Sequence, residues 1–557
     1  MVSRIGVFIC KMKYITLVFT FFLIFGCSIA QESAVRPNDS GFFKISPIPW
    51  DEIKTNVSTE HFKFVKSLDE LKNAISNSEK FIRIDNEIII SENLTIPEGF
   101  NIDLTEKSKF TIIPPNVLTF NAFPVNWNPN TQVFFGSGHG GSTLPREVEG
   151  TFSDQWRYAE WFGAKGNDIS FDNSDAIQSA VSASIWSKPA ANGKQIISQS
   201  KTQLLGTTYY IQKEIDLREC NFTLRGAETR GATKIAAPHN FSFNGKKFFD
   251  ETYTNASDGF EALIVFGSLF PPAIPGRPLG PFGNRFEFIF LDASYASADA
   301  TSKSKRTACV YSPDMIQEGT TFRNCLFQGA SAYLMCFGSF DESSSNYSDV
   351  NMLVIEECEL MGTQSYNGKN SAISIKIARG RFIDIRNCTI IGRNVVTAEP
   401  CQPSILSKAS VLKISNCHLE SGDPVVKINP VPRLRSSLDV GPGLVMENCD
   451  SIQNMGTMVE INSPNARVNL TNLSATYNCA DPTRTPWRTN TPCFVHDVDR
   501  NVFSAGVGTN GGFRALLRYD RYREAGTHPL VNNSLYNANG TAYKVGYLID
   551  TPHPELK

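Results

Sequence analysis

A short pattern that returns about every 30 residues is the feature that most constrains the fold of this chain. Each copy ends a strand-like run at a cysteine, and these cysteines are Cys325, Cys358, Cys388, Cys417 and Cys449. The steps between them are 33, 30, 29 and 32 residues, and a fixed period of this size predicts stacked structural units. Apolar residues alternate within each copy, which predicts a strand with one buried face. No copy is long enough to bury that face alone, so the copies must stack on one another.

The residues between the copies indicate which kind of stack to expect. They are rich in Gly, Asn, Ser, Asp and Pro, which form turns. A second strand-like run follows four of the copies, at 333–337, 373–377, 425–429 and 458–462. Two or three strands per repeat, joined by turns, predict a coil of parallel strands, which is a β-helix.

An asparagine precedes the cysteine in four copies, at Asn324, Asn387, Asn416 and Asn448. Equivalent residues of a coil stack about 4.8 Å apart, so these side chains can hydrogen-bond from one coil to the next. Asparagine also tolerates a left-handed bend between strands. The cysteines beside them are expected to be small buried side chains, although exported proteins commonly form disulfides. Cys479 and Cys493, outside the repeat, are the better candidates for a bridge.

One segment resembles a known family. The stretch Trp161-Phe162-Gly163-Ala164-Lys165-Gly166, followed by Ala176-Ile177-Gln178, resembles the opening segment of pectate-lyase-like β-helix proteins. The chain departs from the family's pattern at Asn167-Asp168 and at Asn173-Ser174. The resemblance implies an all-β fold, a single-stranded right-handed parallel β-helix with an N-terminal capping helix. Such a helix would close the open end of the coil, where strand edges are otherwise exposed.

The chain divides into five predicted regions. These are a signal peptide at 1–30, a linker at 31–60, an N-terminal β-rich segment at 61–150, the parallel β-helix at 151–475, and a C-terminal segment packed on the helix at 476–557. Within the N-terminal β-rich segment, Ser67 and Glu70 form a capping box that predicts a short helix.

The first 30 residues determine the expected location of the protein. Lys13 precedes an apolar run from Ile15 to Phe25, which is typical of a secretory signal peptide. Two ways of processing the signal peptide stay open. One is cleavage after Ala30, and the other is lipid attachment at Cys27, which would anchor the protein to a membrane. In both cases the protein is exported to the periplasm, the cell surface or the medium. The formal net charge of −2 argues against a nucleic-acid partner, which requires a basic face.

The resemblance also implies a polysaccharide as the partner. Lyases with this fold remove a proton next to a sugar carboxylate, which requires a base and a cation or Ca²⁺. Hydrolases instead need two carboxylates. Positions that face outward on the predicted strands supply the candidates: Lys376, His418 and Lys427 as catalytic residues, and Arg379, Arg381 and Glu460 as substrate-binding residues.

Elimination from an anionic, uronic-acid-containing glycan or its oligosaccharides, by a lyase or dehydratase, is the leading expectation. A glycoside hydrolase on the same fold and a non-catalytic glycan-binding or adhesin β-helix are the alternatives. No cofactor is predicted with certainty, and Ca²⁺ stays open. Glu357-Cys358-Glu359 resembles the calcium site of one lyase family, but Gln364 stands where that family has a lysine. Gly138-His139-Gly140 resembles a polygalacturonase motif without its partner aspartates, and we expect it to be a glycine-rich loop.

Overall fold

The computed structural model describes residues 62–136, 148–183, 200–218, 220–237, 243–249, 259–267, 283–294, 306–312, 317–338, 350–362, 373–392, 405–420, 426–428, 443–452, 459–461, 467–471, 474–475, 494–496, 502–506, 517–518, 530–536 and 542–548. The predictions for the signal peptide, the linker, Cys27, His139 and the Cys479–Cys493 pair lie outside these residues. No helix among the described residues is long and apolar enough to span a membrane.

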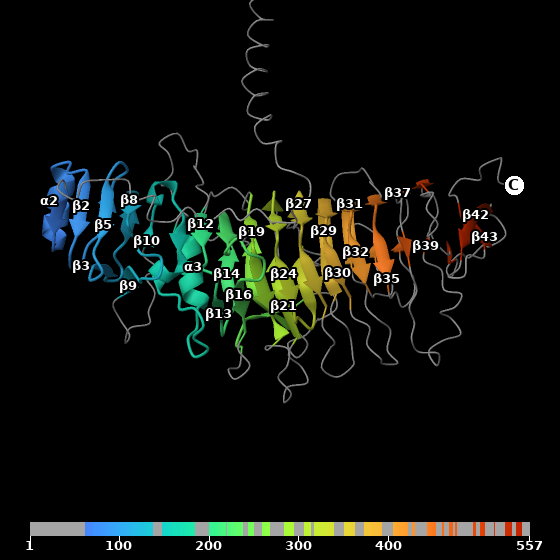
Figure 1. The fold of residues 1–557 in the computed structure, drawn as a ribbon, viewed down its shortest axis with the longest axis horizontal. Helices are drawn as coiled ribbons and strands as arrows, with labels where there is room; N and C mark the ends of the chain where they lie inside the picture. Colours follow the sequence, from blue (N-terminus) through green and yellow to red (C-terminus); the bar gives the residue numbers. More distant parts are fainter. Residues whose placement is uncertain are drawn as a thin grey trace, which may run out of the picture. The chain divides into compact units, whose positions relative to one another are not determined.

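The first described coils form three short parallel sheets (Figure 1). The strands are β1 (Lys63–Val65), β2 (Phe81–Ile84), β5 (Asn101–Leu104) and β8 (Phe123–Val125) in one sheet, β3 (Glu87–Ile90), β6 (Lys109–Ile112) and β9 (Phe134–Gly136) in the second, and β4 (Leu94–Ile96), β7 (Leu118–Phe120) and β10 (Val148–Glu149) in the third. Phenylalanines stack inside them, with the Phe110 and Phe134 ring centroids 5.8 Å apart and those of Phe120 and Phe152 5.0 Å apart. The predicted β-rich segment is therefore a coil in its own right.

Helices border these coils. The predicted capping-box helix is α2 (Leu68–Ser76), in which the Glu70 backbone N–H donates to Ser67 Oγ at 3.3 Å. It packs against β1 and β3 and buries Leu71 and Ala74 in the core, so α2 covers the first strands. The helix expected from the family resemblance is α3 (Ser174–Ser182), which packs against β12, β14 and the 3₁₀ turn η3 (Ala159–Phe162). Since coiled strands precede α3, its role as an N-terminal cap stays a prediction.

Two long sheets follow, with strand order largely following the sequence; their strands pair in parallel except for β17, which pairs with β18 in antiparallel orientation. The 22-stranded sheet contains β11 (Arg157–Tyr158), β12 (Ser200–Gln203), β14 (Ile215–Arg218), β15 (Phe222–Arg225), β17 (Lys247–Phe248), β18 (Phe260–Gly267), β19 (Arg285–Glu287), β21 (Arg306–Ser312), β22 (Gln317–Glu318), β23 (Thr321–Arg323), β25 (Tyr333–Phe337), β26 (Val350–Asn351), β27 (Leu353–Glu356), β29 (Ile373–Arg386), β31 (Ile405–Ser415), β33 (Val426–Ile428), β34 (Gly443–Glu447), β36 (Val459–Ile461), β37 (Arg467–Thr471), β39 (Phe494–His496), β40 (Val502–Gly506) and β41 (Leu517–Arg518). The nine-stranded sheet contains β13 (Thr208–Tyr210), β16 (Thr233–Ala236), β20 (Ile289–Asp292), β24 (Leu326–Gln328), β28 (Glu359–Met361), β30 (Thr389–Ile391), β32 (His418–Glu420), β35 (Asp450–Ile452) and β38 (Ser474–Ala475).

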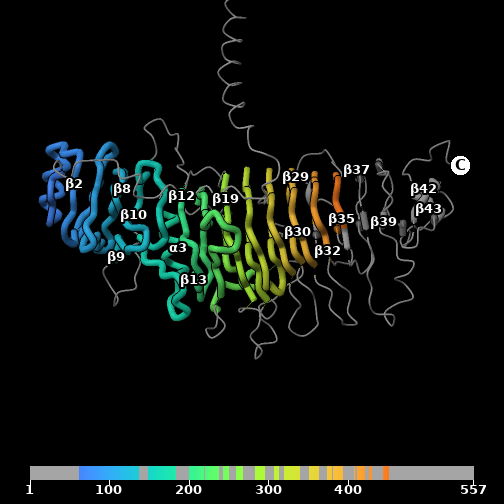
Figure 2. Tube along the Cα trace, in the orientation of Figure 1, coloured from blue at the N-terminus to red at the C-terminus, as the bar shows by residue number. Residues whose placement is uncertain are grey.

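This topology confirms the parallel β-helix predicted from the repeat. One hydrophobic core runs without interruption from Val65 to Cys449, through the coils that Figure 2 traces. Strands β39, β40 and β41 also pair in parallel, so the coil continues beyond residue 475. Near the end of the chain, β42 (Leu530–Tyr536) and β43 (Ala542–Leu548) form a separate antiparallel pair.

The asparagine prediction is confirmed at the bend between the two sheets. Asn324, Asn387, Asn416 and Asn448 have φ between 52° and 55°, and Glu357 takes the same conformation with φ 56°. The amide of Asn416 donates to Asn387 Oδ1 at 3.3 Å. The side chain and the backbone therefore both favour asparagine here, because the left-handed region costs most other residues about 1–2 kcal/mol.

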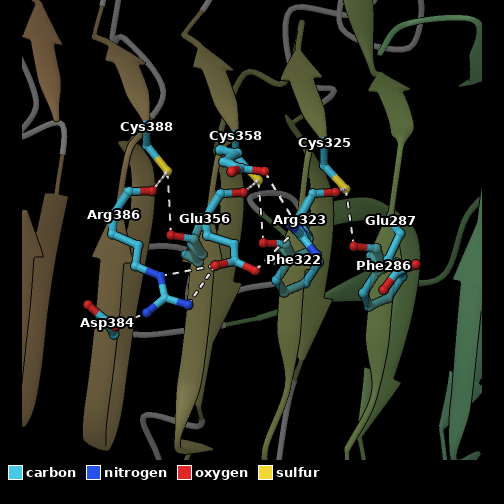
Figure 3. A network of polar contacts seen from close by, with 12 residues as sticks. Phe286, Glu287, Phe322, Arg323, Cys325, Glu356, Cys358, Asp384, Arg386 and Cys388 are labelled. Carbon is cyan, nitrogen blue, oxygen red and sulfur yellow. Dashed lines mark hydrogen bonds and ion pairs between the residues drawn. The ribbon is translucent and has the colours of Figure 1, made fainter. Parts of the chain in front are cut away.

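The cysteine prediction is also confirmed for the five repeat positions, which are buried and free of disulfides. Each thiol donates to backbone carbonyls; for example, Cys358 Sγ lies 3.6 Å from the Phe322 oxygen and 3.2 Å from the Glu356 oxygen (Figure 3). Burial raises the pKa of the Cys358 thiol. The thiols therefore fill the core beside each bend.

Candidate functional site

The strand register shows which predicted site residues share a face. Cys336, Lys376, Leu406, Lys427 and Glu460 occupy one column of the 22-stranded sheet, on successive coils. The structure thus places Lys376 and Lys427 two coils apart in the same column.

Lys376 has no exposed surface. It lies beside a second apolar cluster, separate from the core inside the coil, that we call the outer cluster: Phe248, Phe260, Ala262, Val265, Ala308, Tyr311, Ala332, Tyr333, Cys336 and Ile373. The Lys376 ammonium donates to the Tyr333 hydroxyl at 2.9 Å and lies 4.8 Å from the centre of the Tyr333 ring. The Tyr333 ring contacts Phe260 edge-on, with centroids 5.2 Å apart. Lys376 is therefore covered in this structure, whereas a general base must reach the proton that it removes.

The other predicted residues of this sheet differ in exposure. Lys427 is half-buried and Arg381 is exposed. Arg381 follows a register shift that falls between Ile377 and Gly380 on β29. The side chains of Arg379 and Glu460 lie outside the part of the chain whose side chains the structure describes.

His418 lies on the nine-stranded sheet, between two carboxylates. Its Nδ1 is 2.5 Å from Asp450 Oδ2, and its Nε2 is 3.0 Å from Glu420 Oε1. All three side chains are partly exposed to solvent. Burial acts to lower the pKa of His418, but the hydrogen bonds to Glu420 and Asp450 outweigh it, so this pKa lies above its usual value. The structure does not bring His418 together with Lys376 or Lys427, which lie on the other sheet.

The carboxylates beside His418 were detectable in the sequence. Asp450 follows Cys449 as His418 follows Cys417, so the period places the two side by side. Glu420 lies two residues after His418 and therefore faces the same way. No feature of the sequence, in contrast, points to Tyr333 as the partner of Lys376. Their contact depends on how far a side chain reaches between neighbouring coils.

Alternating charges line the outward face of the 22-stranded sheet beside the bend (Figure 3). Arg386 lies 2.6 Å from Glu356 and 3.4 Å from Asp384, and Arg323 lies 3.5 Å from Glu356. Lys413 continues the series with a contact of 2.7 Å to Glu447. These charges neutralise one another along the coil, so we assign this ladder to stabilising the stack.

The Glu357-Cys358-Glu359 motif does not have the geometry of a calcium site. Cys358 points into the core, Glu357 lies at the bend 3.5 Å from Arg323, and Glu359 lies on β28 at 3.0 Å from Arg230. Each carboxylate thus has an arginine partner. Within the described residues, no group of three or more His, Cys, Asp or Glu side chains is arranged to hold a metal ion.

No protein-family model matches this sequence, and no curated protein matches it. Among solved structures, the chain is similar to ORF18 of Geobacillus virus E2, with 13% identity, a TM-score of 0.39, and coverage of 65% of this chain and 62% of that one. It is similar to the gp42 tailspike of Acinetobacter phage vb_AbaP_AS12, with 12% identity, a TM-score of 0.39, and coverage of 70% and 64%. It is also similar to Pantoea stewartii WceF, a glycan biofilm modifying enzyme with a tailspike-like parallel β-helix fold, with 12% identity, a TM-score of 0.26, and coverage of 73% and 48%. The chain spans less than two thirds of the length of each of these proteins, and the likeness concerns backbone arrangement alone.

Proposed function

We propose that this protein is an exported enzyme that cleaves a uronic-acid-containing glycan or its oligosaccharides by β-elimination, as a lyase or related dehydratase. The observation that carries the proposal is His418, a partly exposed imidazole held by two carboxylates on the outward side of a parallel coil. Export follows from the signal peptide expected at residues 1–30. A long coil with strands about 4.8 Å apart offers a linear polymer a repeating surface.

The hydrogen bonds of His418 define its role in this proposal. The contact with Asp450 is the shorter one, so we assign the Nδ1 proton to it. Nε2 faces Glu420 Oε1 at 3.0 Å, so in this proposal the Glu420 carboxylate turns away when the glycan binds, and Nε2 then accepts a proton from the sugar carbon. Arg230 supplies a cation on the same face. It pairs with Glu359, which lies two coils before His418 in the same column. That separation is about 10 Å, so the guanidinium can bind the carboxylate of a neighbouring sugar on a bound uronic-acid chain, and not that of the sugar that loses its proton.

The pH dependence of such an enzyme follows from His418. Only the neutral imidazole can take a proton, and the carboxylates raise its pKa. We therefore expect kcat/KM for elimination to rise with pH as His418 loses its proton, through a pKa above the ordinary value of about 6.5.

Glycoside hydrolysis is the second candidate, because Glu420 and Asp450 provide two carboxylates around one point. Hydrolysis needs such a pair, one as acid and one as base or nucleophile. The two reactions differ in their products, since only elimination creates a carbon–carbon double bond.

One assay separates the candidates. The purified chain is incubated with alginate, polygalacturonate, ulvan and chondroitin sulfate, and both ultraviolet absorbance from new double bonds and reducing ends are followed. A rise in both supports elimination, and a rise in reducing ends alone supports hydrolysis. Binding without either product would instead identify a glycan-binding protein.

Variants then test the residues. H418A should abolish the activity, whereas K413A, which alters an exposed ion pair on the other sheet, should leave it unchanged. K427A and K376A test the column on the 22-stranded sheet in the same assay. Full activity in H418A would refute the role of His418 as the base. Full activity in both H418A and K427A would also exclude a catalytic role for Lys427 in the column on the 22-stranded sheet.

A further inference from the structure

The outward face of the first four-stranded sheet is unusually aromatic. Val65, Ile82, Ile84 and Ile102 of β1, β2 and β5 point into the core and are fully buried. Alternate residues of a strand point the other way. These include Phe64, Phe81 and Phe123, which are 52%, 38% and 37% exposed. Together with Arg83 and Asn101 they form what we call the N-terminal aromatic face.

The register arranges this face in columns. Phe81, Asn101 and Phe123 lie side by side on β2, β5 and β8. Phe64, Arg83 and Asp103 form the neighbouring column on β1, β2 and β5. Phe81 and Phe123 are two strands apart, a separation of about 10 Å. This spacing is close to that between alternate rings of an extended pyranose chain.

Polar groups between the rings are held in fixed positions. Arg83 Nε donates to Asp103 Oδ2 at 2.5 Å, and its guanidinium lies 5.7 Å from the centre of the Phe64 ring. Asp103 is buried, so this ion pair is firmly anchored. The Asn101 amide donates to the Lys80 carbonyl at 3.4 Å, which holds that side chain between Phe81 and Phe123.

The chemistry of the face is that of a sugar platform. Aromatic rings offer flat apolar surfaces to the C–H faces of pyranose rings. Arg83 and Asn101 offer hydrogen-bonding groups to hydroxyls beside them. The arginine and aspartate neutralise each other, so the face does not depend on a charged ligand. Exposed apolar patches bordered by polar groups commonly mark binding sites.

We propose that the N-terminal aromatic face binds a linear glycan chain, with pyranose rings stacked on Phe81 and Phe123 and hydroxyls bonded to Asn101 and Arg83. The face belongs to a different sheet from His418, so it holds polymer without taking part in its cleavage. The proposal goes beyond the reaction proposed above and does not require it.

Affinity gel electrophoresis of the full chain tests this binding. Native gels contain alginate, polygalacturonate, chondroitin sulfate or neutral hydroxyethyl cellulose, and retardation is measured for the wild type and the F81A/F123A double variant. We expect at least one polymer to retard the wild type, and the double variant to bind it about tenfold less tightly because both stacking contacts are lost, a change of about 1.4 kcal/mol. The matched control is I89A/I113A, which truncates two side chains that are 50% and 37% exposed elsewhere on the same coils. It should retain wild-type binding.

The outcomes are decisive in both directions. Equal retardation of the wild type and F81A/F123A, or no retardation of the wild type by any of the four polymers, would overturn the proposal. A change of oligomeric state in the double variant, measured by light scattering with glycan binding unchanged, would identify the face as an interface between copies and would also overturn it. Cleavage of short oligosaccharides by F81A/F123A should equal that of the wild type, so loss of binding and loss of catalysis are separately visible.

Discussion

Replacing Glu160 with glutamine should remove a strong pH dependence from the stability of this protein. Glu160 lies in η3, which packs between β9 of the first coils and helix α3. It is only 6% exposed. The Tyr209 hydroxyl donates to its Oε1, and its Oε2 has no hydrogen-bond partner within the described part of the chain. Burial raises the pKa of Glu160 from 4.5 to about 7, and the hydrogen bond from Tyr209 opposes part of this rise.

The magnitude follows from the pKa change. A shift from 4.5 to about 7 corresponds to about 3 kcal/mol, because each pKa unit is worth about 1.4 kcal/mol. Below pH 4.5 the carboxyl is protonated in both the folded and the unfolded chain, and its full contribution to stability is present. Between pH 4.5 and about 7 the unfolded chain loses this proton while the folded chain keeps it, so the free energy of unfolding falls. Above about pH 7 the folded chain also ionises, and the loss is complete.

Urea unfolding at pH 5 and pH 8 measures this effect. Trp127 and Trp161, two of the six tryptophans, lie in the same region with ring centroids 4.9 Å apart, so tryptophan fluorescence includes a signal from it. We expect the wild type to lose about 2.5 kcal/mol more than E160Q between the two pH values, because part of the full effect is already lost at pH 5. The matched control is E98Q, which removes an exposed carboxylate in a turn of the same coils. The free energy of unfolding of E98Q should change with pH as that of the wild type does. If the free energy of unfolding of E160Q changed with pH by the same amount, the role assigned to Glu160 would be refuted.

Four further predictions follow from individual contacts. D450N removes a negative charge that helps to raise the pKa of His418, so its pH–rate profile should move to lower pH in the double-bond assay. N387V should destabilise the chain by about 1–2 kcal/mol in urea unfolding, while N387G should be close to neutral, because the bend has φ 55°. Iodoacetamide followed by peptide mass mapping should modify Cys358 only in unfolded protein, since its thiol is buried and burial raises its pKa. R386A should lower stability by less than about 1 kcal/mol, because the Arg386 side chain is 44% exposed and surface ion pairs contribute little.

The repeat made most of the fold predictable. A period of about 30 residues with alternating apolar positions specifies strands, their stacking and which residues face inward. The same reasoning predicted the conformation at Asn387 and Asn416, since asparagine is the common residue that accepts both the bend and the ladder. It did not foresee Glu357, whose side chain has no comparable advantage at the bend, although its backbone adopts the same conformation.

The first coils were harder to recognise because their period differs. Ile82 pairs with Ile102, Ile88 with Phe110 and Leu94 with Leu118, so each face advances by a different number of residues. Short strands with unequal connections leave no fixed period in the sequence. The sequence therefore predicts only an incomplete first set of coils in this segment, whereas its phenylalanine stack belongs to the same continuous core as the later coils.

The candidate site shows that a column position does not determine exposure. Lys376 and Lys427 occupy the same column, so the period alone treats them as equivalent. Lys376 is nevertheless fully buried, because the Tyr333 ring of the preceding coil lies against its side chain. In the coil before Lys427, the column position is occupied by Leu406. The Lys427 side chain is only half-buried. The side chains of adjacent coils, which a repeat allows to vary freely, therefore decide which outward residue can meet a substrate, and this is why we place the chemistry at His418.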